Sequence, residues 1–256
     1  MTLTRIISAL FLFLLFSISF FNSNSIYFQI LVIIVCFFGI YELQNMLFKK
    51  MSIIFLLSTI LLMIVTLLNF PDPMLVSYIS LCYWVLFVPL LILDKLFFSN
   101  FKKYLLGTLL IFNIFYSTIF LHQYHQELLL FALFIVWIAD STAFFVGKKF
   151  GKKKLAPLIS PGKTIEGAVG AIFFTTLFAL VFSDIFDLDS GVAIFYAFVI
   201  TLFSILGDLL ESFLKRHANL KDSGNIIPGH GGVMDRIDGL CASIPIIFSI
   251  IIIFDL

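Results

Sequence analysis

Charged residues are scarce in this sequence, and their scarcity excludes most classes of soluble protein. Lys, Arg, Asp and Glu make up 12% of the 256 residues, whereas hydrophobic residues make up 61%. Soluble domains average about 25% charged and about 45–50% apolar residues. The formal net charge is +1, so bulk charge identifies no partner, and we expect no nucleic-acid ligand.

Cysteine is also rare, and its placement excludes a disulfide framework or a thiolate metal site. Cys36, Cys82 and Cys241 are widely spaced within apolar runs, and no CxxC or Cys/His metal spacing occurs. We interpret them as small buried hydrophobic residues. A cleavage site is missing too, because Asn-Ser-Asn-Ser follows the first apolar run where a signal peptide would have A-x-A. We therefore expect this run to be retained as a membrane span.

Long apolar runs dominate what is present. Runs of roughly 17–25 mostly apolar residues, separated by short polar breaks, are typical of transmembrane helices. The sequence therefore predicts an all-α polytopic integral membrane protein with about nine spans. They cover residues 5–21, 26–47, 51–69, 74–93, 104–121, 127–147, 165–183, 191–214 and 239–254.

The basic residues support this count. If nine helices alternate in direction, all 16 Lys and Arg residues fall on the side of the N-terminus. The other side has none and contains only acids and histidines between its spans. By the positive-inside rule the N-terminus is cytoplasmic and the C-terminus lies outside. The residues on the basic side are Arg5, Lys49, Lys50, Lys95, Lys102, Lys103, Lys148, Lys149, Lys152, Lys153, Lys154, Lys163, Lys215, Arg216, Lys221 and Arg236.

Polar segments divide the chain into two regions. Residues 1–126 contain about five spans and only short loops. Residues 127–256 contain the two long polar segments, the cytoplasmic loops 148–164 and 215–238. Any chemistry is therefore expected at the cytoplasmic face of the C-terminal half.

Acids inside predicted spans are costly and mark candidate functional sites. Asp140 lies well inside one span, and Asp208 and Glu211 lie in the last turns of another. Glu42 also lies near a span end, where we expect solvation to account for it. Asp208, Ser212 and Lys215 share one helix face. A Glu211–Lys215 bridge within the helix is an alternative interpretation, but it leaves Asp208 unexplained.

The segment Ile227–Gly239, IPGHGGVMDRIDG, differs most from its surroundings. Its glycines permit close backbone approach to phosphate or metal. His230 and Arg236 suit phosphate oxygens, and the carboxylates of Asp235 and Asp238 suit Mg²⁺. The segment therefore indicates magnesium–phosphate chemistry.

The earlier loop contains SPGKT, which is not a P-loop, because Pro157 stands where that motif needs glycine. We interpret Ser160–Glu166 as a compact turn that leads into the next helix. Thr164 is expected to cap that helix, and Gly167 and Gly170 are expected to permit close helix packing. The lysines of residues 148–154 suit membrane topology and anionic lipid contact.

Taken together, these motifs resemble the phosphatidate cytidylyltransferase (CDP-diacylglycerol synthase) family. The match includes Ser212–Arg216, Lys221–Gly224 and Pro228–Asp238 with the family spacing, and Asp140 and Ser160–Gly167 upstream. Two positions depart from the pattern, Asn219 in place of glycine and Gly239 in place of serine. Asn is the next-best residue for a left-handed helix end, so we expect the geometry to persist.

The resemblance implies that CTP and phosphatidic acid give CDP-diacylglycerol and pyrophosphate, assisted by one or two Mg²⁺ ions. It implies metal binding by Asp208 and Asp235, and substrate binding near Asp140, which would hold a cation. The other substrate-binding candidates are Ser160, Lys163, Thr164 and Glu166. The catalytic candidates are Ser212, Lys215, Arg216, Lys221, Asp222, His230, Arg236 and Asp238.

Two other functions are compatible with part of this pattern. A CTP-dependent polyprenol or phytol kinase would transfer the γ-phosphate to a lipid alcohol, and an ion-coupled transporter would place acids along a path through the bilayer. The clustering of charges on one face disfavours the transporter. The resemblance further implies a homodimer among membrane lipids, and we expect a bacterial inner membrane.

Overall fold

The structure is a computed structural model that describes residues 2–48, 52–93, 99–227, 229 and 231–254. Helices form most of it, with one small hairpin. The first six helical elements are α1 (Thr2–Phe20), α2 (Ile26–Leu47), α3 (Ile53–Leu68), α4 (Pro73–Leu81), the π-helix η1 (Cys82–Phe87) and α5 (Val88–Leu93). The remaining elements are α6 (Asn100–Tyr124), α7 (Gln126–Phe150), β1 (Lys154–Ala156), β2 (Ser160–Thr164), α8 (Ile165–Phe182), the 3₁₀ helix η2 (Ser183–Phe186), α9 (Ser190–His217) and α10 (Met234–Phe254).

The helices confirm a multi-pass membrane protein. Within the described ranges, seven helices are long and apolar enough to cross a membrane, and two shorter apolar helices cover Ile6–Phe20 and Ile53–Leu68. Each of the nine predicted spans coincides with helical residues of the described chain. The number of crossings and their orientation remain predictions.

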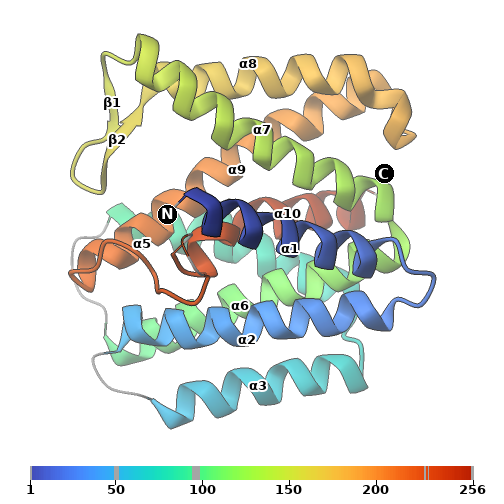
Figure 1. Cartoon of the computed structure of the whole chain (residues 1–256). Helices are drawn as coiled ribbons and strands as arrows, with labels where there is room; N and C mark the ends of the chain where they lie inside the picture. The colour runs from blue at the N-terminus through green and yellow to red at the C-terminus, as the bar shows by residue number, and fades with distance from the viewer. Residues whose placement is uncertain (1, 49–51, 94–98, 228, 230, 255–256) are drawn as a thin grey trace.

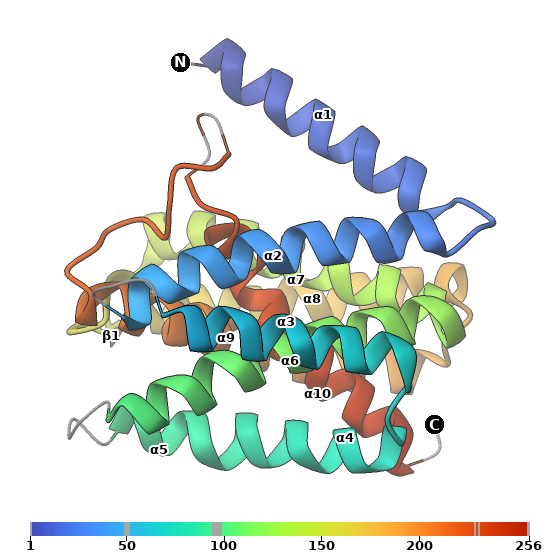
Figure 2. The same ribbon diagram turned by 90° about the horizontal axis from the view of Figure 1, so that it is seen from below.

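The helices form two groups on either side of α10. In Figure 1, α7, α8 and α9 lie above it, and α2, α3 and α6 lie below it. α10 packs against α9 on one side and against α4 and α6 on the other. Both views place the β-hairpin and the segment after α9 at one end of the bundle and the last turn of α10 at the other end, and Figure 2 shows α1 inclined away from the remaining helices.

Local sequence features account for the helix boundaries. The side chains of Asp72 and Asp189 accept hydrogen bonds from Met74 N (3.2 Å) and Gly191 N (2.8 Å), and so cap α4 and α9. Asn219 has the left-handed φ of 59° expected after α9. The predicted span 74–93 contains the π-helical turns of η1, because Pro89 has no N–H group to continue the α-helical ladder.

The expectation of a compact turn at Ser160–Glu166 is wrong. β2 pairs with β1 in an antiparallel hairpin, with Lys154 opposite Thr164 and Ala156 opposite Ser160. The strands satisfy backbone groups that a single turn would leave unpaired. Thr164 caps α8 as expected, since its hydroxyl accepts a hydrogen bond from Gly167 N (3.1 Å).

Two glycines bring neighbouring helices unusually close. A Cβ atom on Gly167 would lie 2.7 Å from Ala143 O, which confirms the expected close packing of α7 and α8. A Cβ atom on Gly207 would collide with the carbonyl oxygen of Asp238 and lie 3.2 Å from Ala242 Cβ. The second contact fixes α9 against the first turns of α10.

We expect Gly207→Ala to destabilise the protein by about 1–3 kcal/mol, because the added methyl group must push α9 and α10 apart. Thermal unfolding in detergent measures this. Gly162→Ala is the matched control, since a Cβ atom there would meet no atom within 4 Å. Equal unfolding midpoints for the two variants would contradict the tight α9–α10 contact.

Candidate active site

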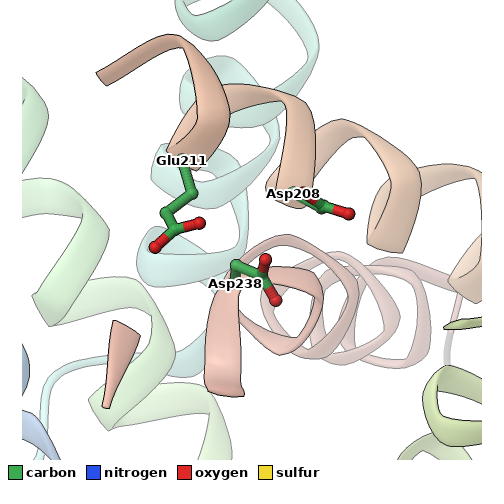
Figure 3. Close-up of side chains that lie close together, drawn as sticks. All are labelled: Asp208, Glu211 and Asp238. Carbon is green, nitrogen blue, oxygen red and sulfur yellow. The ribbon is translucent and has the colours of Figure 1, made fainter. Parts of the chain in front are cut away.

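Three carboxylates converge where α9 meets α10. Asp208 and Glu211 project from α9, and Asp238 projects from the first turns of α10 (Figure 3). One carboxylate oxygen from each lies within 4.8 Å of those of the other two. We call Asp208, Glu211 and Asp238 the acid cluster.

The acid cluster fits a divalent cation by the chemistry of its donors. Three like charges at this separation repel one another, and a bound cation would offset that repulsion. The Glu211 side chain is 2% exposed, and its Oε1 atom accepts no hydrogen bond from any described residue. Hard oxygen ligands of this kind are those that Mg²⁺ prefers.

Lys215 supplies positive charge at the Glu211 side of the acid cluster. Its ammonium group pairs with Glu211 within α9 and with Asp235 Oδ1 of α10 at 2.8 Å. The alternative interpretation of a Glu211–Lys215 bridge is therefore confirmed, but the bridge extends to a second helix. Because Lys215 contacts both helices, it links α9 to α10 electrostatically.

Asp235 is occupied with contacts to its own loop. Its Oδ2 atom accepts hydrogen bonds from Ser223 N and Gly232 N, both at 3.0 Å, while Oδ1 faces Lys215. It is not a member of the acid cluster. Its assignment as a metal ligand therefore remains a prediction, and the contacts show it organising the segment before α10.

Asp208 receives its counter-charge from the hairpin. Lys163 of β2 forms an ion pair with Asp208 Oδ2. Ser212 Oγ donates a hydrogen bond to Asp208 Oδ1 at 3.3 Å, as their shared helix face predicts. The sequence gives no sign of the Lys163 pairing, because it joins residues far apart in the chain.

A pocket of about 640 Å³ opens between α7, α8, α9 and the hairpin. It brings together four of the predicted substrate-binding residues, Asp140, Ser160, Lys163 and Thr164, and adds Asp208 from the acid cluster. Apolar side chains form another part of its wall, among them Ala139, Ala143, Phe144, Leu155 and Ile205. The pocket therefore has a polar end, where Lys163 lies with two carboxylates, and an apolar wall.

The fifth predicted substrate-binding residue has another contact. Glu166 accepts hydrogen bonds from the backbone N–H groups of Lys152 (3.0 Å) and Lys153 (3.2 Å). These bonds close the lysine-rich segment onto the start of α8. Glu166 thus shapes the hairpin beside the pocket.

The other predicted catalytic residues lie near the end of α9 and the start of α10. Arg216 Nε donates to Ile159 O at 3.4 Å and so joins α9 to the hairpin. Lys221 and Asp222 are exposed in the segment after α9, and Arg236 is exposed in the first turn of α10. His230 lies outside the described residues.

The expectation that solvation accounts for Glu42 is wrong. Glu42 is 1% exposed, and its carboxylate accepts hydrogen bonds from Val233 N (3.0 Å) and Met234 N (2.9 Å) at the start of α10. The segment before α10 covers the end of α2 and removes Glu42 from water. The sequence does show an acid near the end of an apolar span, which makes Glu42 a candidate functional residue. It does not show the partners of Glu42, because they lie about 190 residues away.

Comparison with known proteins gives consistent matches. A family model described as "Cytidylyltransferase family" matches residues 3–254. A phosphatidate cytidylyltransferase of Staphylococcus aureus (strain COL) is 34% identical over 222 residues, 82% of this chain and 84% of that protein. One of Bacillus subtilis (strain 168) is 44% identical over 140 residues, 52% of this chain and 51% of that protein, so this alignment spans about half of each.

We expect Lys215→Met to destabilise the protein by about 3–5 kcal/mol, because it leaves Glu211 and Asp235 without their shared cation. Thermal unfolding in detergent measures the loss. Lys152→Met, a change at an exposed position, is the control. Adding Glu211→Gln to Lys215→Met should recover part of the loss, since the amide needs no counter-charge. A Lys215→Met variant as stable as the control would refute the linking role of Lys215.

Proposed function

The chain belongs to the cytidylyltransferase family, and from this premise we propose that it transfers the cytidylyl group of CTP to phosphatidic acid. The products are CDP-diacylglycerol and pyrophosphate. The observation that carries the proposal is the position of Asp208, which belongs to the acid cluster and also lines the pocket. A lipid phosphate bound in the pocket would therefore lie beside a CTP phosphate that a cation holds at the acid cluster.

The pocket suits the lipid substrate. Lys163 and the capped start of α8 offer positive charge to a phosphate monoester, while Phe144, Leu155 and Ile205 offer an apolar surface to the glycerol and acyl chains. Lys163 pairs with Asp208 in this structure, so substrate phosphate would compete with that carboxylate. Asp140, also in the pocket, would orient the same lysine when it turns toward the lipid.

The reaction needs charge control more than a base. An oxygen of the lipid phosphate attacks the α-phosphorus of CTP, a new P–O bond forms, and the bond to the β-phosphate oxygen breaks as pyrophosphate leaves. The lipid phosphate is already ionised near neutral pH. The chain must therefore offset the repulsion between two anions.

The cationic residues around α9 and α10 meet this need. We assign the CTP phosphates to Arg216, Lys221, His230 and Arg236, four basic residues of the motif that resembles the family's. Lys215 holds Glu211 and Asp235 in place, and Ser212 holds Asp208. Asp222, exposed in the same segment, would orient a neighbouring cation.

The acid cluster would hold Mg²⁺, with Asp208, Glu211 and Asp238 as ligands. When bound, one or two Mg²⁺ ions neutralise phosphate charge and stabilise the departing pyrophosphate. Asp235 becomes a further ligand only if it releases Lys215 or a loop amide. The resemblance assigns no metal role to Glu211, but its buried Oε1 atom accepts no hydrogen bond from the described residues, and this supports Glu211 as a ligand.

The site must admit both a water-soluble nucleotide and a membrane lipid, and this supports a position of the site at the membrane surface. We propose a bacterial inner membrane, nine crossings and a cytoplasmic N-terminus, because all 16 basic residues then share one side. CTP would arrive from the cytoplasm and the lipid laterally from the bilayer. We further propose a homodimer, which the small-residue helix faces permit.

Purified protein with phosphatidic acid, Mg²⁺ and α-³²P-labelled CTP should form a chloroform-soluble product. We expect Asp208→Asn and Asp235→Asn to abolish this transfer while the protein still inserts and folds. The first change removes an acid-cluster charge, and the second weakens the hold on Lys215 and the loop amides. Scintillation counting of the lipid phase measures both.

Asp184→Asn is the matched control, because Asp184 is exposed in η2, far from the hairpin. It should keep wild-type transfer. Near-normal turnover by Asp235→Asn would refute the role of that carboxylate. Label that stays aqueous for the wild-type protein, with γ-label passing to a polyprenol, would establish the lipid kinase instead.

The topology proposal places the C-terminus outside the cytoplasm. A C-terminal alkaline phosphatase fusion should therefore be active in cells, and a C-terminal green fluorescent protein fusion should be dark, because each reporter matures on only one side. Fusions after Lys152, in the hairpin segment, should show the opposite pattern. Fluorescent C-terminal fusions would overturn the proposed orientation.

A further inference from the structure

Glu42 contributes a buried carboxylate from the N-terminal half of the chain to the segment that precedes α10. Its Oε2 atom accepts hydrogen bonds from Ser223 Oγ (2.8 Å) and Met234 N (2.9 Å), and its Oε1 atom accepts one from Val233 N (3.0 Å). Ser223 and Val233 belong to the segment 218–233 between α9 and α10, and Met234 is the first residue of α10. One side chain of α2 thus ties Ser223 to the start of α10.

The position of the carboxylate matches the needs of a helix start. α10 begins at Met234, and the first N–H groups of a helix have no partner within it. The Glu42 carboxylate accepts from one of these donors, Met234 N, and from Val233 N directly before the helix, and it interacts favourably with the helix dipole. α10 is thereby capped by a residue of a different helix.

The hydrogen bonds continue from Glu42 to the acid cluster. Ser223, which donates to Glu42, also donates its N–H to Asp235 Oδ2 at 3.0 Å and accepts from Asp235 N at 3.3 Å. Asp235 contacts Lys215, and Lys215 contacts Glu211. A continuous chain of contacts therefore runs from α2 to the acid cluster.

The segment also fits closely around this carboxylate. Cβ atoms on Gly224 or Gly232 would collide with the Glu42 carboxylate, and one on Gly232 would also collide with Ser223 Oγ. Glycine is required at both positions for the backbone to approach the acid. The fit leaves little freedom for the start of α10 while the carboxylate remains in place.

We propose that Glu42 is a positioning residue for the transfer reaction. It fixes the start of α10 so that Asp235 reaches Lys215 and Asp238 faces Asp208 and Glu211. The inference rests on the proposed function for its chemical consequence, but its structural part is independent of it. It also gives the N-terminal half of the chain a direct role at the site.

Glu42→Gln tests the proposal with almost no change in volume. The amide keeps one acceptor oxygen, but its NH₂ group faces hydrogen-bond donors, so at least one contact is lost. In metal-free protein, hydrogen exchange at Val233 and Met234 should become about tenfold faster. The kcat for lipid formation should fall about 10- to 100-fold with little change in KM for CTP, because ground-state binding groups remain.

Ser80→Ala is the matched control. Ser80 Oγ donates a buried hydrogen bond to Asn113 Oδ1 at 2.8 Å, which joins α4 to α6 and involves neither Glu42 nor the segment 218–233. It should lower the unfolding midpoint without altering exchange at Val233 and Met234 or kcat. Ser223→Ala combined with Glu42→Gln should cost less than the sum of the two single losses, because both act through one network.

The outcomes separate this inference from the proposed function. Wild-type exchange and wild-type kcat in Glu42→Gln would overturn it. Faster exchange with unchanged kcat would make Glu42 a structural cap only and would also overturn it. If the wild-type protein shows no lipid product, the proposed function fails, and the exchange measurement alone decides whether Glu42 fixes the start of α10.

Discussion

The contact of Lys215 with carboxylates of two helices, Glu211 of α9 and Asp235 of α10, is the interaction on which the site depends. α9 and α10 approach so closely at Gly207 that their acidic side chains must face one another. Such an approach is unfavourable among like charges unless a cation lies between them. Lys215 provides that charge for Glu211 and Asp235, and Lys163 provides it for Asp208.

Two further acids, the partly buried Asp208 and the buried Glu42, are compensated from distant parts of the chain. Lys163 reaches Asp208 from the hairpin, and the amides before α10 reach Glu42 on α2. An acid that has left water is stabilised only where its partners reach it. These contacts therefore favour one arrangement of the elements that carry the acids and their partners. The hairpin, α2 and the α9–α10 pair are thus fixed relative to one another by charge as well as by packing.

Features encoded locally are predictable from this sequence, whereas pairings between distant helices are not. Apolar runs predict the long helices of the described residues, Thr164 predicts the cap of α8, and Asn219 predicts the left-handed turn after α9. The strands of the hairpin are only three and five residues long, too short to show alternation. Glu42 was misinterpreted because nothing near it in sequence shows that a segment about 190 residues later covers it.

The position of the site at one end of the bundle follows from the cost of charge in a bilayer. Carboxylates near the middle of a span are expensive, whereas helix ends offer amide groups, loop cations and access to water. Asp208, Glu211 and Asp238 occupy such ends, and the pocket beside them extends among apolar side chains of α7 and α9. Under the proposed function, a lipid phosphate would reach the acids without leaving the membrane, while a nucleotide would reach them from water. The placement that lowers the free-energy cost of the acids would therefore also give both proposed substrates access to them.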